Sequence, residues 1–209
     1  MNLVEALTRL RSLLLESPQP RWPESLLEEA IRQVLGEYNQ YYPLARQAVL
    51  QIAESSEGLD LSALEGLCEV LQVKFSWPLK KSVSGKKDEP DWSFIFHDGR
   101  PILQVNHPAE LEKSDKIHVW YRRLHTIAGL DGALHTTISP DHESILLAGA
   151  AGYAALARCL ERSQAFSLDY KNSAYLNDWG NDRLKDFRQS IKRQSSFCWL
   201  GGREGWWRV

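Results

Sequence analysis

Six histidines give this chain its widest range of possible chemistry, because an imidazole can serve as an acid, a base or a metal ligand near neutral pH. No two of them are four residues apart, and no cysteine stands beside one of them. Neither the helical histidine pair nor the cysteine–histidine cluster of a zinc site is therefore present. The sequence predicts no metal site and no cofactor. The six are His97, His107, His118, His125, His135 and His142.

One catalytic arrangement stays open as an alternative. His125 and His135 flank a short segment that contains Asp131, and a carboxylate beside a histidine can orient it as the base of a hydrolase. The favoured interpretation is structural: Gly129 and Gly132 shape a turn, Asp131 caps it, and the histidines bond to backbone groups. No nucleophile elbow and no glycine-rich phosphate loop accompany the segment. We therefore expect that the chain is not an enzyme.

The composition is that of an ordinary globular protein, since 43% of the 209 residues are hydrophobic, 25% are charged and the net charge is -2. This length suits one domain with a sizeable core or one domain with an inserted lobe. The charge does not indicate nucleic acid or a membrane as the main partner. Three widely spaced cysteines suit a reducing compartment. Neither a cationic, apolar leader nor a bilayer-length apolar run is recognisable. We expect the protein to be cytoplasmic when synthesised and not to bind a membrane.

The N-terminal part predicts two helices. Apolar residues recur at helical spacing from Leu3 to Leu14. A second helix is expected to begin after Pro23 and to end before Pro43, because proline suits the first turn of a helix and not its interior.

The C-terminal part predicts two more helices. Ser139 and Pro140 form a favourable helix start, and the segment that follows is apolar on nearly every side. Such a helix must be buried, either in its own fold or against other subunits. A last helix is predicted from about residue 173 to residue 192, with one apolar face.

Five short segments between these helical parts have the apolar patterns of strands. Asp98 and Gly99 separate two of them, and Asp-Gly is a strong signal for a two-residue hairpin. No crossover helix lies between the strands, so we expect one antiparallel sheet, with 58–64 as a turn or short helical link. The predicted strands are Ala48–Ala53, Val70–Trp77, Trp92–Phe96, Pro101–Val105 and Ile117–Tyr121.

Together these elements predict an α+β fold, in which N- and C-terminal helices form a small helical bundle with an inserted antiparallel β-sheet. We place the helical domain at 1–45 and 126–195 and the β lobe at 46–125. A basic tail rich in tryptophan and glycine occupies 196–209.

Three groups of side chains are candidate interaction surfaces. Tyrosines end the second helix, lysines of a polar loop can contact phosphates, and tryptophans of the tail are costly to leave exposed. The first 45 residues carry net negative charge and the C-terminal part carries net positive charge, which suits head-to-tail contact between copies. The residues are Tyr38, Tyr41, Tyr42, Lys80, Lys81, Lys86, Lys87, Trp199, Trp206 and Trp207.

Four segments, taken in order, resemble one family. Ala30–Pro43 is a helical pattern that ends in Tyr-Asn-Gln-Tyr-Tyr-Pro, and His125–Thr137 contains His-Thr-Ile-Ala-Gly-Leu-Asp-Gly-Ala. Leu146–Arg158 is a helix of small residues, and Leu176–Ile191 spaces leucine, tryptophan and phenylalanine along a helix. These patterns are similar to those of the head-to-tail connector (adaptor) proteins of tailed bacteriophages and prophages. The lysine-rich loop 80–87 and the tail do not match, so the exact neck component (adaptor, stopper or tail-completion protein) stays open.

The resemblance implies a structural virion-assembly protein without catalysis. Such a protein forms a homo-oligomeric ring beside neighbouring virion proteins such as a portal, with DNA passing close by, and it is part of the assembled virion. Two other hypotheses remain. One is a non-viral α+β module that binds a protein partner through its Trp-rich C-terminal tail, and the other is a hydrolase with a His125, Asp131 and His135 site.

Overall fold

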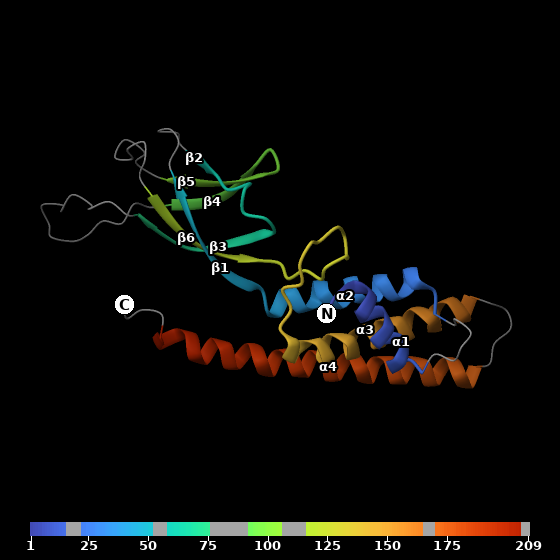
Figure 1. The fold of residues 1–209 in the computed structure, drawn as a ribbon. Helices are drawn as coiled ribbons and strands as arrows, with labels where there is room; N and C mark the ends of the chain where they lie inside the picture. Colours follow the sequence, from blue (N-terminus) through green and yellow to red (C-terminus); the bar gives the residue numbers. More distant parts are fainter. Residues whose placement is uncertain (16–21, 52–57, 76–91, 106–115, 165–169, 206–209) are drawn as a thin grey trace, which may run out of the picture. The chain divides into compact units, whose positions relative to one another are not determined.

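A computed structural model describes residues 1–15, 22–51, 58–75, 92–105, 116–164 and 170–205. The side chains of 162–164, 170–173 and 195–205 are outside that description. The chain divides into two compact units, which we call the helical unit (Met1–Pro43 and His125–Val209) and the sheet unit (Leu44–Leu124). Four helices and two antiparallel sheets confirm the predicted α+β fold (Figure 1).

The helices begin and end where local backbone chemistry favours it. The Asn2 side chain accepts a hydrogen bond from the Glu5 N–H at 2.9 Å and so caps the first helix. Pro23 precedes the second helix, and Pro140 is the first residue of the third. The helices are α1 (Leu3–Leu13), α2 (Glu24–Tyr41), α3 (Pro140–Gln164) and α4 (Tyr170–Gly205).

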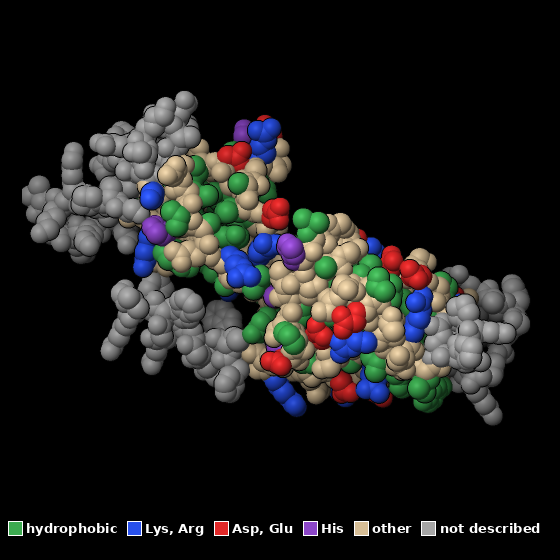
Figure 2. Space-filling model, viewed as in Figure 1, with side chains coloured by type: hydrophobic (Ala, Val, Ile, Leu, Met, Phe, Trp, Pro, Cys, Tyr) green, Lys and Arg blue, Asp and Glu red, His purple; other side chains and the backbone are tan. Residues whose placement is uncertain are grey.

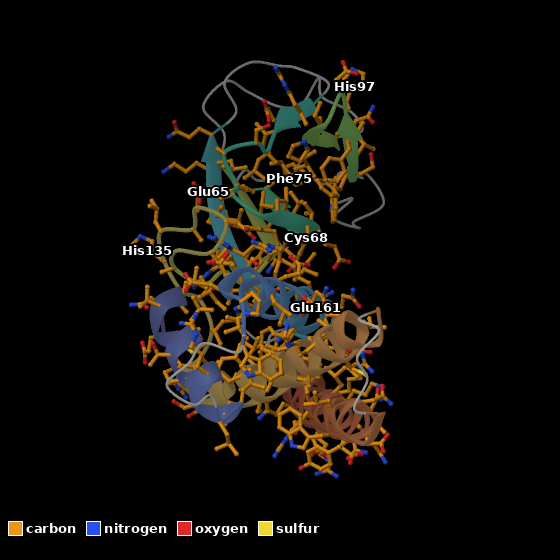
Figure 3. The ribbon with its side chains drawn as sticks, turned by 90° about the vertical axis from the view of Figure 1, so that its right-hand side faces the viewer. Glu65, Cys68, Phe75, His97, His135 and Glu161 are labelled. Atoms are coloured by element: carbon orange, nitrogen blue, oxygen red, sulfur yellow. The ribbon has the colours of Figure 1, made fainter. Side chains whose placement is uncertain are left out.

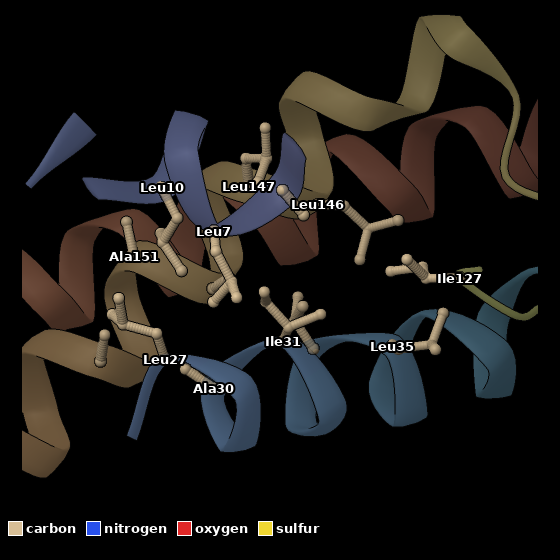
Figure 4. Close-up of a cluster of buried hydrophobic side chains, with 14 of the residues drawn as sticks. Leu7, Leu10, Leu27, Ala30, Ile31, Leu35, Ile127, Leu146, Leu147 and Ala151 are labelled. Carbon is tan, nitrogen blue, oxygen red and sulfur yellow. The ribbon is translucent and has the colours of Figure 1, made fainter. Parts of the chain in front are cut away.

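Each helix of the helical unit turns one apolar stripe toward a common core (Figure 4). Leu10 of α1, Leu27 of α2 and Leu146 of α3 are at most 2% exposed. Burying one such side chain contributes roughly 1.5–3 kcal/mol. Phe187 and Ile191 bring α4 into the same core, so one apolar cluster joins all four helices.

Helices α3 and α4 approach each other closely at two glycines. A Cβ atom added at Gly152 would lie 2.9 Å from the backbone oxygen of Gly180, and one added at Gly180 would lie 3.0 Å from the oxygen of Gly152. Any side chain larger than a hydrogen atom at either position would therefore force the two backbones apart. The small residues of α3 therefore pack against α4 of the same chain. The composition of α3 allows burial in its own fold or against other subunits, and the crossing shows the first of these.

One helix departs from the expectation that no segment is long enough to span a bilayer. Within α3, Pro140–Glu161 is long and apolar enough to cross a membrane by length and composition. The core helix of a folded protein meets the same criterion. Leu146, Ala150 and Ala154 are at most 2% exposed, so this face of α3 lies in the core of the helical unit.

The last helix is longer than predicted, because α4 continues past Lys192 as far as Gly205. No proline or glycine interrupts the chain between Lys192 and Leu200, and residues of ordinary helix propensity allow the helix to continue. The end predicted at about residue 192 follows the end of the apolar stripe, which is not where the backbone leaves the helix.

The sheet unit contains two three-stranded antiparallel sheets where one sheet was predicted (Figure 1). Their strand orders are β1-β6-β3 and β2-β5-β4. The additional strand, β2, has only three residues, which is too short to show an alternating pattern. The strands are β1 (Leu44–Gln51), β2 (Gly58–Asp60), β3 (Leu67–Phe75), β4 (Trp92–His97), β5 (Arg100–Val105) and β6 (Lys116–Arg123).

Both sheets contribute to a single core within this unit. Val73 of β3, Val119 of β6 and Leu103 of β5 are at most 3% exposed and belong to one apolar cluster. Leu61, in the link after β2, is fully buried beside them. The alternation of apolar and polar residues along β6 therefore marks its two faces, as expected for a half-buried strand.

The predicted hairpin is present at the turn between β4 and β5. His97 pairs with Arg100, so Asp98 and Gly99 form a two-residue turn. Both have positive φ, 49° and 75° respectively, which is the conformation of the turn that matches the twist of a hairpin. Figure 3 shows His97 at the tip of this hairpin.

The crossing of α3 and α4 gives a direct test of the fold. We expect Gly152→Ala to lower the free energy of unfolding by about 1–3 kcal/mol, because the added methyl meets backbone rather than a movable side chain. Urea denaturation followed by circular dichroism would measure it.

The matched control is Gly36→Ala on α2, where an added Cβ meets nothing within 4 Å. There, alanine should stabilise the protein by about 0.5–1 kcal/mol through its better helix propensity. Equal stability of the two variants would contradict the close crossing.

Candidate functional site

The segment His125 to Pro140 is a loop with internal turns, and it hydrogen-bonds to the N-terminal residues of the helical unit. Gly129, Asp131 and Gly132 all have positive φ, at 90°, 50° and 78°. Glycine adopts this conformation freely, and aspartate is one of the few other residues that tolerate it. The N–H of Leu3 donates to the Ala128 oxygen at 2.9 Å, so the turn also holds the start of α1.

The His125, Asp131 and His135 cluster is not formed. Two nitrogens of Arg32, on α2, donate hydrogen bonds to Oδ1 of Asp131 at 2.8 and 3.1 Å. His125 is buried, and its Nδ1 lies 3.1 Å from the backbone oxygen of Thr137. His135 is exposed, and Figure 3 shows it on the outside of the loop. Within the described residues, no three His, Cys, Asp or Glu side chains are arranged to hold a metal ion.

The three tyrosines that end α2 have different environments. Tyr38 is 1% exposed, and its hydroxyl shares a hydrogen bond with His142 Nδ1 at 2.5 Å. Its expected role as a contact surface is therefore wrong: the ring belongs to the core. Tyr42 packs partly buried against the same core, with its ring 5.0 Å from that of His142. Tyr41 is 37% exposed, and Lys192 Nζ lies 5.7 Å from the centre of its ring.

One carboxylate joins three helices. Glu37 of α2 accepts hydrogen bonds from Arg188 of α4 at 2.6 and 3.2 Å, and from the Tyr153 hydroxyl of α3 at 2.7 Å. Burial alone would raise the pKa of Glu37, but the bonds from Arg188 and Tyr153 outweigh it and leave the pKa below its ordinary value. Burial, followed by the bond to Glu37, raises the pKa of Tyr153.

The other predicted contact residues lie outside the described structure. Lys80, Lys81, Lys86 and Lys87 fall within 76–91. The Trp199 side chain is not described, although its backbone belongs to α4, and Trp206 and Trp207 follow the last described residue.

The sheet unit carries a surface that the sequence did not reveal, which is the edge of β1 that pairs with no other described strand. β1 pairs with β6 through eight successive residues without a register shift, and it lies at the edge of its sheet. At the opposite edge, β3 has two register shifts, between Leu67 and Glu69 and between Val70 and Gln72. Such bulges protect an edge from further pairing. Among the described strands, β1 is thus the long edge without that protection.

Apolar side chains are exposed along these strands. Val49 of β1 is 52% exposed and Leu71 of β3 is 41% exposed, while Ile95 and Phe96 of β4 are 39% and 61% exposed. Figure 2 shows hydrophobic side chains on the visible surface of the sheet unit, with Lys, Arg and His at their margins. Exposed apolar groups beside a free edge are typical of a surface that pairs with another chain.

Sequence reasoning placed the first strand at Ala48–Ala53, whereas β1 begins at Leu44, directly after Pro43. A pattern was present, since Leu44, Ala48 and Leu50 recur at even positions and are half-buried. Nothing in the sequence identifies which strand lies at the edge of a sheet, because the strands that pair are distant in the chain.

No protein-family model matches the chain, and no curated protein sequence is significantly similar to it.

The Glu37 junction predicts how stability changes with pH. Because its pKa is lowered in the folded protein, Glu37 contributes stability above its ordinary pKa of 4.5, and this contribution is lost as the pH falls through the folded value. Glu37→Gln should lower the free energy of unfolding by about 1–3 kcal/mol at neutral pH, and by less in acid. Urea denaturation at pH 7 and pH 3 measures both values.

The control is Glu28→Gln, which removes a carboxylate from the same helix and should lower the free energy of unfolding at pH 7 by less than Glu37→Gln does. A Glu37→Gln variant that loses the same stability at both pH values would contradict an ionic role for this carboxylate.

Proposed function

We propose that this chain is a structural protein of the neck of a tailed phage or prophage. Copies assemble as a ring around the path of the DNA, next to neighbouring virion proteins such as a portal. Two independent features support the proposal: the resemblance of four segments to connector proteins, and the free edge of β1 in the sheet unit.

The four resembling segments build the helical unit. Ala30–Pro43 and Leu146–Arg158 supply the inner faces of α2 and α3, and Leu176–Ile191 supplies the face of α4 that contacts them. His125–Thr137 is the turn that holds the start of α1. The likeness therefore falls on residues that form the core and the loop of the helical unit. The sheet unit is the part whose described strands leave edges unpaired.

The observation that carries ring assembly is the β1 edge. A strand of this length leaves a row of backbone N–H and C=O groups that a neighbouring strand can satisfy. β1 contains no proline, and Arg46 is its one charged residue. Closed rings grow through unlike surfaces on the two sides of a subunit. The edge of β4, in the other sheet, is the unlike surface that we assign to the neighbouring copy, because Ile95 and Phe96 lie exposed on that strand.

The assembly state is the first test of this function. We expect light scattering over a concentration series to show a large species of one mass, and negative-stain microscopy to show rings of uniform diameter. The protein should also be found by mass spectrometry in virions purified from cells that carry its gene. A chain that is monomeric at its highest soluble concentration and absent from those particles would overturn the proposal.

A substitution at the edge tests the surface itself. Val49→Lys places a charge on an exposed side chain of β1 and should weaken association at least tenfold in light-scattering titrations, because charged edge residues oppose strand pairing. The fold should be preserved, since position 49 is 52% exposed.

Leu71→Lys is the matched control, because it adds the same charge to an exposed leucine of the same sheet at the bulged β3 edge. Equal weakening by both variants would show a general effect of charge and would contradict pairing through β1.

A further inference from the structure

The sheet β1-β6-β3 has an outer face that its core does not use. Along β6, Ile117, Val119 and Tyr121 are at most 7% exposed and belong to the core of the sheet unit. The alternate residues lie on the opposite side of the sheet, where His118 and Trp120 are half-buried. We call this side of the sheet the outer face. It includes His118, Trp120 and the residues of β1 and β3 that pair with this side of β6.

The centre of the outer face is a fixed aromatic surface. The rings of His118 and Trp120 are stacked, with centroids 6.1 Å apart and planes 23° apart. Gln47 of β1 lies opposite Trp120, and its Nε2 is 3.2 Å from His118 Nδ1. Gln72 of β3 lies opposite Trp120 from the other side. Glutamines thus pair with Trp120 on both neighbouring strands, which places hydrogen-bonding groups on the same face as the indole.

Three cations lie on the same face of the sheet as these rings. Lys74 Nζ lies 5.4 Å from the centre of the Trp120 ring, which shows that a charged group can reach the face of the indole. Lys116 and Arg122 flank the aromatic pair along β6. The carboxylate on this face is that of Glu69, 2.8 Å from Arg122. Three cations against one carboxylate make the described part of the outer face positive, in a chain whose net charge is -2.

We propose that the outer face binds single-stranded nucleic acid. A base would stack on Trp120, Lys74 and Lys116 would contact phosphates, and the glutamine amides would meet the edges of the base. A duplex hides the faces of its bases, and the face of a three-stranded sheet does not enter its grooves as a helix does. A protein partner could also cover a half-buried tryptophan, but the excess of cations favours a polyanion. This inference does not rest on the proposed assembly function.

The test is fluorescence anisotropy of labelled oligonucleotides with the full chain. The probes are oligothymidylate, oligouridylate and a duplex of the same length, each titrated over a series of salt concentrations. We expect both single strands to bind more tightly than the duplex, and the ratio of the two single strands to show whether DNA or RNA is preferred. Trp120→Ala should weaken single-strand binding about 5- to 150-fold, and Trp120→Phe should restore part of it.

Charge is tested separately with Lys74→Gln, which should reduce the dependence of log affinity on log salt by about one. The matched control is Arg46→Gln, which removes the same charge from an exposed position of the same sheet on the side of Tyr121. Circular dichroism confirms that each variant is folded. Absence of single-strand binding at low salt, equal binding of duplex, or equal effects of Lys74→Gln and Arg46→Gln would each overturn the proposal.

Discussion

At the crossing of α3 and α4, the backbones of Gly152 and Gly180 approach so closely that a methyl group on either would meet a backbone oxygen. The packing of α4 in the helical unit depends on this distance. It allows Phe187 and Ile191 of α4 to reach the same core as the side chains of α2 and α3, and it brings Arg188 within reach of Glu37. A wider crossing would cost apolar burial and would break the junction of three helices at one carboxylate.

Most of what could be predicted from the sequence depends on neighbouring residues. Proline fixes its own backbone angle, so Pro23 and Pro140 predicted the starts of α2 and α3. Asp98 and Gly99 predicted their hairpin, because the turn needs two residues that accept positive φ. The spacing of Leu27, Ile31 and Tyr38 on one helix face also predicts burial, and Tyr38 follows that rule rather than the surface role expected for it.

What could not be predicted depends on pairs that are distant in the chain. Arg32 and Asp131 are separated by 99 positions, and their ion pair occupies the carboxylate that a catalytic histidine of this segment would need. The division of the strands into two sheets required knowing that β1 and β3 both pair with β6. The same holds for the outer face, because the alternation along β6 shows that Trp120 leaves the core but not that Lys74 and Gln47 stand beside it.

At least one pair of the unlike charges at the two ends is used within a single copy. The negative N-terminal part and the positive C-terminal part suggested head-to-tail attraction between copies, yet Arg188 of α4 is bound to Glu37 of α2, and Lys192 lies over Tyr41 of the same chain. Ion pairs between exposed side chains of two copies would contribute little to their association, about 0–1 kcal/mol each. A free strand edge offers a row of directional hydrogen bonds that fix both the register and the orientation of a neighbour. In the proposed ring, therefore, the angle between successive copies is set by strand pairing, while charge affects the rate at which copies meet more than the geometry they reach.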